Sequence, residues 1–300
     1  MLAVVAGLTH YWDHLQPVAD VLMLRGVDVQ VWRPAGRWPP RRLTAPTLVA
    51  GHRDIRYTRG PVAMLNHGAG HTYRTNHPSY AGGRDRNRIS LFLEPGPVPA
   101  AASRKAQPDA TVAEVGCPKL DRITRAPEPV AVACWHWPAR IAGGAAGWAH
   151  PAWQDQVQTM RQAVEPLTLA THAHPRAAQV IQRWARAVDV PYIDDCQQVL
   201  ATACLMLVDN SSVAWEAAAL NIPVVLLDSP GLPRTADGIW EWPPGPHATP
   251  DLLVAAVKDA CQGTYWREQR ARAADHTYTV KPGFAAASAA SAIETWLRSL

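Results

Sequence analysis

The sequence predicts an α/β protein with two Rossmann-like, doubly wound domains that face a cleft. Short apolar runs of strand length alternate with helical patterns, and this alternation occurs twice along the chain. Pro127 and Pro129 bracket the expected linker between the two series. With 300 residues and 48% hydrophobic content, the chain is large and apolar enough for two domains. We expect domains at residues 1–127 and 128–284, followed by a closing helix at 285–300.

The first half opens as a βαβ unit, which is typical of dinucleotide-binding folds. The pattern predicts a strand at Leu2–Ala6, a loop at Gly7–His10, a helix at His14–Leu24 and a strand at Val27–Trp32. The rest of this half is expected to hold strands at Pro61–Leu65, Ile89–Leu93 and Thr111–Val115, with loops over 33–46 and 72–88.

The second half repeats the alternation. The expected elements are a strand at Val130–Cys134, a loop at Pro138–His150, a helix at Trp153–Ala163, strands at Leu167–Thr171 and Tyr192–Ile193 with a helix at Arg176–Val188 between them, and later helices at Thr249–Cys261 and Ala285–Leu300.

A further βαβ unit, which runs from Leu205 and ends in a strand at Val224–Leu227, carries the most informative polar residues. The strand Leu205–Val208 ends in Asp209, and Ser211 and Ser212 precede a helix at Val213–Leu220. Either serine can cap this helix, and the amides beside them can hold an anion. Glu216 lies one helical turn further on and can face the same ligand, as a ribose diol would require. The alternative is an ordinary capped helix with a surface glutamate.

Cysteine usage and hydropathy favour a cytoplasmic protein. The five cysteines are odd in number and have no C-x-x-C spacing, which fits a reducing compartment without structural zinc. No apolar run has membrane-spanning length, so we expect no integral membrane contact. The first residues resemble a strand more than a signal peptide.

Charge is unevenly distributed along the chain. Residues 1–125 hold 17 Lys and Arg against 9 Asp and Glu, whereas residues 126–300 hold 12 against 16. Between residues 33 and 88 there are 11 arginines and only two acids. A basic half favours a polyanionic partner such as nucleic acid, a polyol-phosphate chain or a membrane surface. The alternative is a solvated basic face that keeps the protein soluble.

The βαβ unit resembles the donor-binding half of GT-B glycosyltransferases. It is most similar to the CDP-glycerol glycerophosphotransferase branch, whose pattern is D-x-S-S, an acidic residue, and a small residue before x-P. Asp209, Ser211, Ser212, Glu216 and Ile222-Pro223 match it. Glu216 stands where that branch usually has Asp; sugar-transferring relatives often have Glu, so the donor stays open between UDP- and CDP-linked compounds.

The resemblance continues in order from about residue 60 to the last residue. The matching segments are Asn66-His67-Gly68 with the H-G turn, Val115 to Asp121 with v-G-x-P-r-x-D, Val130 to Pro138 with the first strand of the second domain, His174-Pro175 with the H-P turn, and Lys281-Pro282-Gly283 with the D-G-x-A segment. The resemblance implies that the last helix crosses back onto the first domain. The opening departs from related nucleotide-sugar transferases, because Asp13 replaces the glycine of G-H-x-x-P at His14.

The resemblance also implies roles for individual residues. His67 is the first candidate for the general base, and His14 and Asp13 are the second. Donor phosphates would be held by His174 and Arg140, together with the Asp209, Ser211, Ser212 and Glu216 site. Each has an alternative: a histidine at a strand end often only caps a loop, and Arg140 can be a surface residue. The acceptor would contact Arg53, Arg56, Arg59 and His71 in the basic half. No carboxylate joins the histidines at metal-ligand spacing, so we expect no metal and no cofactor besides the nucleotide-activated co-substrate.

The expected function is therefore transfer of a sugar, or a sugar-like alditol phosphate, from a nucleotide donor to a hydroxyl on a polyanionic acceptor. DNA with a hydroxymethylated base is one candidate acceptor, as in phage DNA-modifying glycosyltransferases. The alternatives are teichoic-acid-type glycerophosphate transfer, a sugar-nucleotide 2-epimerase, and a non-catalytic nucleotide- or nucleic-acid-binding module.

Overall fold

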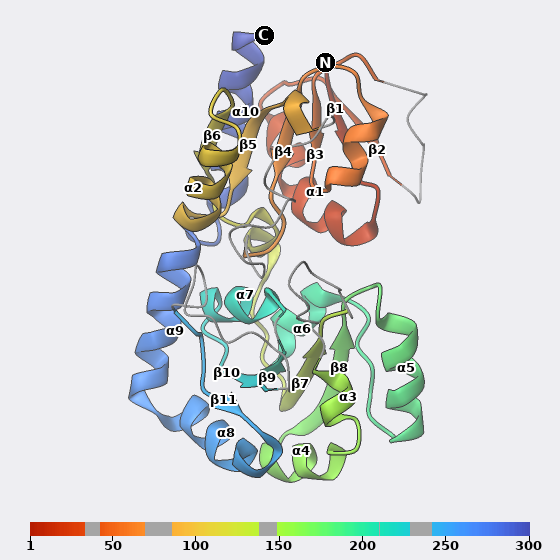
Figure 1. Ribbon diagram of the computed structural model, residues 1–300, viewed down its shortest axis with the longest axis vertical. Helices are drawn as coiled ribbons and strands as arrows, with labels where there is room; N and C mark the ends of the chain where they lie inside the picture. Colours follow the sequence, from red (N-terminus) through yellow and green to blue (C-terminus); the bar gives the residue numbers. More distant parts are fainter. Residues whose placement is uncertain (34–42, 70–85, 138–148, 210, 229–241) are drawn as a thin grey trace. The chain divides into compact units, whose positions relative to one another are not determined.

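The computed structural model describes residues 1–33, 43–69, 86–137, 149–209, 211–228 and 242–300 (Figure 1). Its internal contacts divide the chain into two compact units. Unit 1 contains Met1–Arg122 and His276–Leu300, and unit 2 contains Ile123–Asp275. The sequence-based boundaries at residues 127 and 284 differ from these by several residues in each case.

Unit 1 is built on a parallel sheet of six strands in the order β2-β1-β3-β4-β5-β6. The strands are β1 (Leu2–Val5), β2 (Val29–Trp32), β3 (Thr47–Val49), β4 (Val62–Leu65), β5 (Ile89–Glu94) and β6 (Thr111–Glu114). Most residues of β1, β3, β4 and β5 are buried, as expected for parallel strands that are covered on both faces. The strand order reverses between β1 and β3, which is where ligands bind in open α/β sheets.

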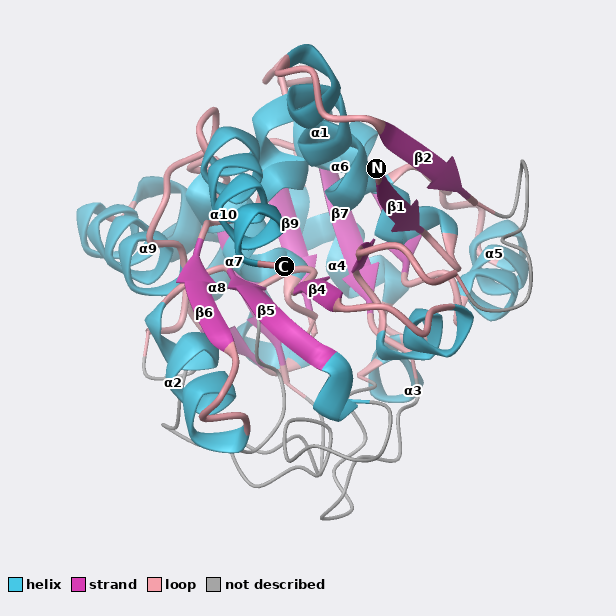
Figure 2. Cartoon of the chain, turned by 90° about the horizontal axis from the view of Figure 1, so that it is seen from above, coloured by secondary structure: helices cyan, strands magenta, loops and turns pink. Residues whose placement is uncertain are grey.

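Helices from the two ends of the chain cover one face of this sheet. The helices of unit 1 are α1 (Thr9–Leu24), α2 (Pro97–Ala106) and α10 (Ala285–Ser299), and 3-10 segments occur at His52–Tyr57, Arg86–Arg88 and Pro118–Arg122. The helices α1 and α10 lie side by side and share a core with β1, β3, β4 and β5 (Figure 2). α2 packs against β5 and β6. The last helix therefore belongs to the core of the first unit.

Asp121 fixes the start of α10. Its carboxylate accepts hydrogen bonds from the backbone N–H groups of Gly283, Ala285 and Ala286, at 2.7, 3.3 and 2.7 Å. The amides of Ala285 and Ala286 belong to the unsatisfied first turn of the helix, so the side chain acts as an N-terminal cap contributed from a distant segment. The Asp of the G-x-P-x-x-D motif thus has a structural role in this chain.

Unit 2 is a parallel sheet of five strands in the order β11-β10-β9-β7-β8. Its strands are β7 (Val130–Trp135), β8 (Thr168–Ala173), β9 (Leu205–Val208), β10 (Val224–Leu227) and β11 (His247–Ala248). Its helices are α3 (His150–Trp153), α4 (Val157–Val164), α5 (Ala178–Ala187), α6 (Cys196–Thr202), α7 (Val213–Ala219) and α8 (Leu253–Gln262), and α9 (Thr264–Thr277) contains the boundary between the units.

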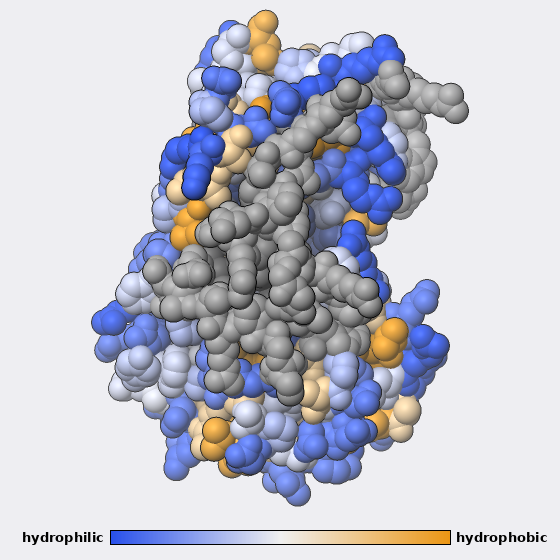
Figure 3. Space-filling view, viewed as in Figure 1, coloured by the Kyte–Doolittle hydropathy of each residue, from blue (hydrophilic) through white to orange (hydrophobic). Residues whose placement is uncertain are grey.

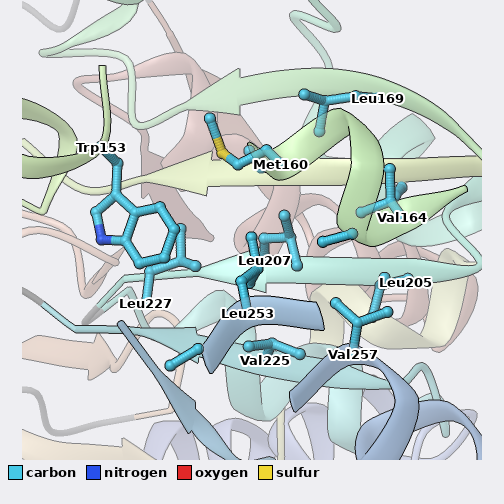
Figure 4. Packing of buried hydrophobic residues seen from close by; sticks show 14 of the residues in the cluster. Trp153, Met160, Val164, Leu169, Leu205, Leu207, Val225, Leu227, Leu253 and Val257 are labelled. Atoms are coloured by element: carbon cyan, nitrogen blue, oxygen red, sulfur yellow. The ribbon is translucent and has the colours of Figure 1, made fainter. Parts of the chain in front are cut away.

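The core of unit 2 forms where alternate strand residues meet α4 and α8. Leu205 and Leu207 of β9 belong to one buried cluster with Met160 and Leu253, and Trp153 lies at one end of the part drawn in Figure 4. Each such aliphatic side chain contributes roughly 2 kcal/mol through burial. The helix α7 packs against β9 and β10 and is absent from this cluster, so the sheet is covered on both faces.

Several elements differ from the sequence-based expectation. The helix α1 begins at Thr9, whereas a loop was predicted through His10. The single helix predicted at 153–163 is two helices, because residues 154–156 form a turn between α3 and α4. The predicted strand at Tyr192–Ile193 is one isolated bridge to Thr171. The prediction did not include β3, β11, α2, α6 and α9.

The visible surface is mainly hydrophilic. On the face shown in Figure 3, apolar residues of the described segments form small separate patches among polar ones. Among the described helices, none combines the length and apolar composition that a membrane span requires.

Candidate functional site

The turn after β4 holds a histidine in a defined orientation. His67 lies between Asn66 and Gly68, which has φ of 84°, in the left-handed region that favours glycine. The His67 Nδ1 is 2.7 Å from the carbonyl oxygen of Ala50 at the end of β3. A carbonyl can only accept, so Nδ1 carries the proton, and Nε2 is the basic nitrogen of the neutral ring. The side chain is half-buried, and Nε2 can take a proton from a hydroxyl group.

Glu94, the last residue of β5, holds this turn in place through a hydrogen bond with Asn66. Its two carboxylate oxygens accept hydrogen bonds from Asn66 Nδ2 at 2.7 Å and from Ser103 Oγ at 2.6 Å. Burial raises the pKa of Glu94, and the two hydrogen bonds oppose that rise. The contact ties Asn66, and with it the neighbouring His67, to the rigid sheet.

His14, the second candidate base, lies near His67 inside unit 1. The ring centroids of the two histidines are 6.1 Å apart, and His14 is only 4% exposed. Burial lowers the pKa of His14 well below its ordinary value, with Lys119, His67 and His10 acting in the same direction. His14 is therefore neutral at pH 7 and less accessible than His67. Asp13 is half-buried on the same helix.

The turn after β1 is held by a second buried carboxylate. The N–H of Gly7 donates to Asp54 Oδ2 at 2.8 Å, and a Cβ atom at residue 7 would stand 2.0 Å from Asp54 Oδ1. Only glycine fits this close approach. Burial raises the pKa of Asp54, and the Gly7 hydrogen bond opposes the rise. Asp54 thus joins the 3-10 segment His52–Tyr57 to the start of α1.

In unit 2, Asp209 links the ends of β7 and β9. The N–H of His136 lies 3.0 and 2.9 Å from its two carboxylate oxygens, and the N–H of Ser211 lies 3.2 Å from Oδ1. Burial raises the pKa of Asp209 to about 7 against the pull of these backbone donors and that of Ala149. The Asp209 side chain is 2% exposed, so it shapes the backbone around the turn rather than presenting a carboxylate to solvent.

The helix α7 begins directly after this turn. Ser211 Oγ accepts a long hydrogen bond of 3.5 Å from the N–H of Val213, whereas Ser212, the N-cap residue, makes no side-chain cap hydrogen bond. Both serines are half-buried. Glu216 is 2% exposed, so the alternative of a surface glutamate is wrong. The structure brings Asp209, Ser211, Ser212 and Glu216 together around one strand-to-helix turn.

An aromatic and basic group lies at the ends of β7 and β8. His174 has its ring 5.7 Å from that of His136 and 6.1 Å from that of Trp137. The guanidinium of Arg176 lies 4.4 Å from the Trp137 ring centroid, a cation–π distance. The His174 Nδ1 accepts from the N–H of Arg176 at 3.2 Å, so Nε2 of the neutral ring carries a proton and can donate to a phosphate.

His136 is the neutral member of this group. Burial lowers its pKa to about 4; a hydrogen bond to the Trp137 carbonyl opposes this, and Arg176 adds to it. The sequence analysis singled out His174 but not His136, Trp137 or Arg176. A signal was present, because polar and aromatic residues directly follow two apolar strands, and the carboxyl ends of parallel strands meet at one edge of a sheet.

Three of the four predicted acceptor residues lie on one surface segment of unit 1. Arg53, Arg56 and Arg59 are all exposed on or beside the 3-10 segment His52–Tyr57. Asp54 of the same segment points inward to Gly7. Arg140 and His71 lie outside the described residues. Among the residues that the structure describes, no group of three or more His, Cys, Asp or Glu side chains could hold a metal ion.

Comparisons with known proteins identify the fold. No protein-family model matches the chain. No curated protein matches it either. Among solved structures, the wall teichoic acid polymerase TagF matches with a TM-score of 0.70 and 12% identity over 100% of this chain and 89% of TagF. S. aureus MnaA in complex with UDP matches with a TM-score of 0.65 and 13% identity over 100% of this chain and 97% of that one.

A third solved structure leads to the same fold. UDP-GlcNAc 2-epimerase from Neisseria meningitidis, bound to UDP-GlcNAc, matches with a TM-score of 0.60 and 12% identity over 98% of this chain and 99% of that one. At these identities the similarity defines the fold alone. The chain therefore has the GT-B fold of two Rossmann-like domains, as the sequence predicted.

Proposed function

We propose that this chain is a GT-B-type transferase that moves a sugar, or a sugar-like alditol phosphate, from a nucleotide-activated donor to a hydroxyl group of a polyanionic acceptor. The observation that carries the proposal is the hydrogen bond between His67 Nδ1 and the Ala50 carbonyl. It fixes the neutral ring with Nε2 as the basic atom, which is the form that a general base needs.

In the proposed reaction, His67 Nε2 removes the proton of the acceptor hydroxyl. The acceptor oxygen forms a bond to the anomeric carbon of a sugar donor, while the bond from that carbon to the diphosphate oxygen breaks and the nucleoside diphosphate leaves. With a CDP-alditol donor, the oxygen would attack the phosphorus of the alditol phosphate and CMP would leave. Both routes need hydrogen-bond donors for the negative leaving group.

Unit 2 would bind the donor. The N–H groups beside Ser211 and Ser212, the Nε2–H of His174 and the guanidinium of Arg176 are the candidate phosphate partners. Glu216 would orient the ribose. MnaA was solved with UDP, and a TagF variant was soaked with CDPG, which supports a nucleotide-linked donor without choosing between the two.

The acceptor is proposed to be polyanionic because of the three exposed arginines of unit 1. Their charge is not offset at the surface by Asp54, whose carboxylate points inward. DNA with a hydroxymethylated base and a polyol-phosphate chain both offer phosphates and a hydroxyl group. Duplex DNA would bind with a steep salt dependence, because each neutralised phosphate releases about one counterion.

A second candidate function is a sugar-nucleotide 2-epimerase, since an epimerase is among the matching structures. Such an enzyme needs acidic groups around its substrate. In unit 1 the buried carboxylates Glu94 and Asp54 already accept hydrogen bonds from Ser103, Asn66 and Gly7. This arrangement favours the transferase.

One experiment separates these functions. The full chain would be incubated with UDP- and CDP-linked donors, alone, with hydroxymethylated DNA, and with a polyol-phosphate primer, and nucleotide release and epimer formation would be measured. We expect release only with an acceptor, and the productive acceptor identifies its class. The reaction should persist in EDTA, because no metal is proposed. Epimer formation without acceptor would refute the transferase proposal and support the epimerase. Tight donor binding without any turnover would contradict both functions.

A further inference from the structure

Three arginines of unit 2 donate to carbonyl groups at the C-terminal ends of helices. Arg125 donates to three carbonyls at the end of α6, and Arg161 donates to two at the end of α5. Arg270 of α9 donates from Nη1 to the carbonyl oxygen of Ala260 at 2.9 Å, in the last turn of α8. A cation is favourable there, because the last carbonyls of a helix are unsatisfied and carry the negative end of its dipole. Capping α8 is therefore one role of Arg270.

Arg270 differs from the other two arginines in its burial and in its partners. It is 4% exposed, whereas Arg125 and Arg161 are half-buried. Within the described residues, the bond to Ala260 is the one hydrogen bond that the Arg270 side chain forms, and Nε is a buried atom without a partner. A guanidinium has five N–H donors, so the cap leaves most of them unused. Buried polar groups are hydrogen-bonded in nearly all cases, so these donors call for an acceptor from outside the chain.

The charge of Arg270 has no acidic counterpart in its described surroundings. Burial lowers the pKa of Arg270, the Cys261 thiol opposes this, and the Arg267 guanidinium adds to it. Partial burial raises the pKa of Cys261, with Arg270 opposing the rise and Cys204 adding to it, so this thiol is neutral at pH 7. The carboxylates of α8 and α9 are all exposed, and among the described acids none forms an ion pair with Arg270. They belong to Asp259, Glu268 and Asp275.

The unused donors have the arrangement that an oxyanion needs. Nε–H and one N–H of Nη2 point in the same direction along one edge of the planar guanidinium, which matches two oxygens of a carboxylate or a phosphate. Because Nη1 is the nitrogen bound to Ala260, this edge is the one that remains. Arg267 lies one helical turn before Arg270 and is exposed, so its charge adds to the attraction.

We propose that Arg270 and Arg267 bind an oxyanion, of the phosphate or carboxylate class, at the corner where α9 follows α8 (Figure 1). Pairing with an anion would remove the cost of burying this guanidinium, which the end of one helix offsets only in part. The bond to Ala260 holds the guanidinium in place before the anion arrives. Access is from the surface at Arg267 and Cys261, which are exposed.

This corner lies away from the proposed donor site. Cys204, which acts on Cys261, directly precedes β9, so the corner lies at the amino ends of the strands of unit 2. Ser211 and His174 instead follow the carboxyl ends of β9 and β8. The anion is therefore neither the donor nor its leaving group, and the inference goes beyond the proposed function and does not depend on it. A bound anion would stabilise α9, the helix through which the chain leaves unit 2.

The test uses the full chain with inorganic phosphate and acetate as probes, and chloride at equal ionic strength as the control. Calorimetry would measure the affinities, and the probe that binds more tightly assigns the class of anion. Arg270→Gln keeps an N–H donor and removes the charge; we expect about tenfold weaker binding of that probe. Arg270→Lys keeps the charge and loses the two-donor edge, and should bind it about threefold more weakly than the wild type. Arg161→Gln is the matched change at a helix-capping arginine of the same unit and should leave the affinity unchanged.

Two results would overturn the site. One is equal affinity of folded wild type and folded Arg270→Gln for both probes, because phosphate bound at the proposed donor site does not depend on Arg270. The other is equally tight binding of chloride, which would show an adventitious ion only.

If neither Arg270 variant folds, the wild type alone decides. An anion beside Cys261 disfavours its thiolate, so saturating probe should slow the alkylation of Cys261 by iodoacetamide about threefold, relative to a free thiol in the same solution. Mass spectrometry of the Cys261 peptide measures this rate, and a rate that the probe leaves unchanged would refute the site.

Discussion

The two units carry different chemistry at the carboxyl ends of strands that are otherwise similar. In unit 1 the imidazoles of His10 and His67 are half-buried, and two buried carboxylates, Asp54 and Glu94, hold neighbouring turns in place. In unit 2 the carboxylate Asp209 also holds a turn, and the accessible rim is formed by Trp137, His174 and Arg176.

In the proposed function, one architecture serves two tasks. In both units, buried carboxylates orient backbone N–H or amide groups, so the sheet end is rigid before any ligand arrives. The difference lies in the outer groups: imidazoles that can take up a proton in unit 1, and an aromatic plane with fixed hydrogen-bond donors in unit 2. The predictions below test this division, from the largest expected effect to the smallest.

Removing the Asp209 carboxylate should damage unit 2 most. Asp209→Ala leaves the buried N–H of His136 and the partly buried N–H of Ser211 without their acceptor. We expect a loss of about 3 kcal/mol in the free energy of unfolding at pH 7. Urea denaturation would measure it. Asp195→Ala is the control, because Asp195 caps the exposed start of α6 through Gln197 and should cost about 1 kcal/mol. Equal losses would contradict a special role for Asp209.

The same variant tests the titration of Asp209. Burial raises its pKa to about 7, whereas an unfolded chain has a value near 4. Between these pH values the folded state binds the extra proton, so the stability that Asp209 contributes below about pH 4 is lost as pH rises through 7.

The advantage of wild type over Asp209→Ala should therefore shrink by up to a few kcal/mol between pH 4 and pH 8. The lowered pKa values of His136 and His150 make stability rise with pH, which is the opposite trend. Both histidines remain in the variant, so their contributions largely cancel in the difference between wild type and variant. Urea denaturation at several pH values would show the trend, and an advantage that grows with pH would refute the assignment.

His67→Ala tests the catalytic side of the comparison. Turnover should fall by about 100-fold or more, because no base then receives the acceptor proton, while donor affinity stays at the wild-type value. Steady-state kinetics and donor titration give the two quantities. If His67→Ala keeps the full rate and His14→Ala is inactive, the general base is His14 and not His67.

Glu216→Ala is the corresponding change in unit 2. This variant should weaken donor binding and preserve the fold.

The smallest effect is expected on the outer surface of unit 1. Changing Arg53, Arg56 and Arg59 together to alanine should leave stability within about 0.5 kcal/mol, since the side chains are exposed. It should flatten the salt dependence of polyanion binding, while donor affinity stays the same. A salt titration with DNA and with a polyol-phosphate oligomer measures this slope. An unchanged slope would show that these arginines do not contact the polyanion.

The sequence was sufficient where burial alone decides the structure. Leu205–Val208 and Val224–Leu227 are apolar runs covered on both faces, and their predicted bounds agree with β9 and β10. The start of α1 was less visible, because Thr9 and His10 are polar and Leu8 provides no side-chain cap. The prediction did not include α2, which begins at Pro97, because no apolar periodicity marks it, although proline is compatible with the first turn of a helix.

The site was predictable only in part, for a related reason. His67 follows a strand directly, so its place at a sheet end could be read locally. The proximity of Lys119 and His14 depends on the packing of α1 against a distant segment, which no local pattern encodes. Helical spacing placed Glu216 one turn after Ser212, but the burial of its side chain follows from the face that α7 turns to the sheet.

The cap that Asp121 places on α10 has a consequence for the order in which the protein can form during synthesis. The core of unit 1 includes Ala289, Ile293 and Trp296 of α10, so this unit cannot be completed when its first segment leaves the ribosome. Unit 2 is continuous in sequence and can fold earlier. At typical elongation rates the sheet of unit 1 waits on the order of ten seconds for its last helix. During that interval the part of the apolar core that α10 covers stays in contact with water.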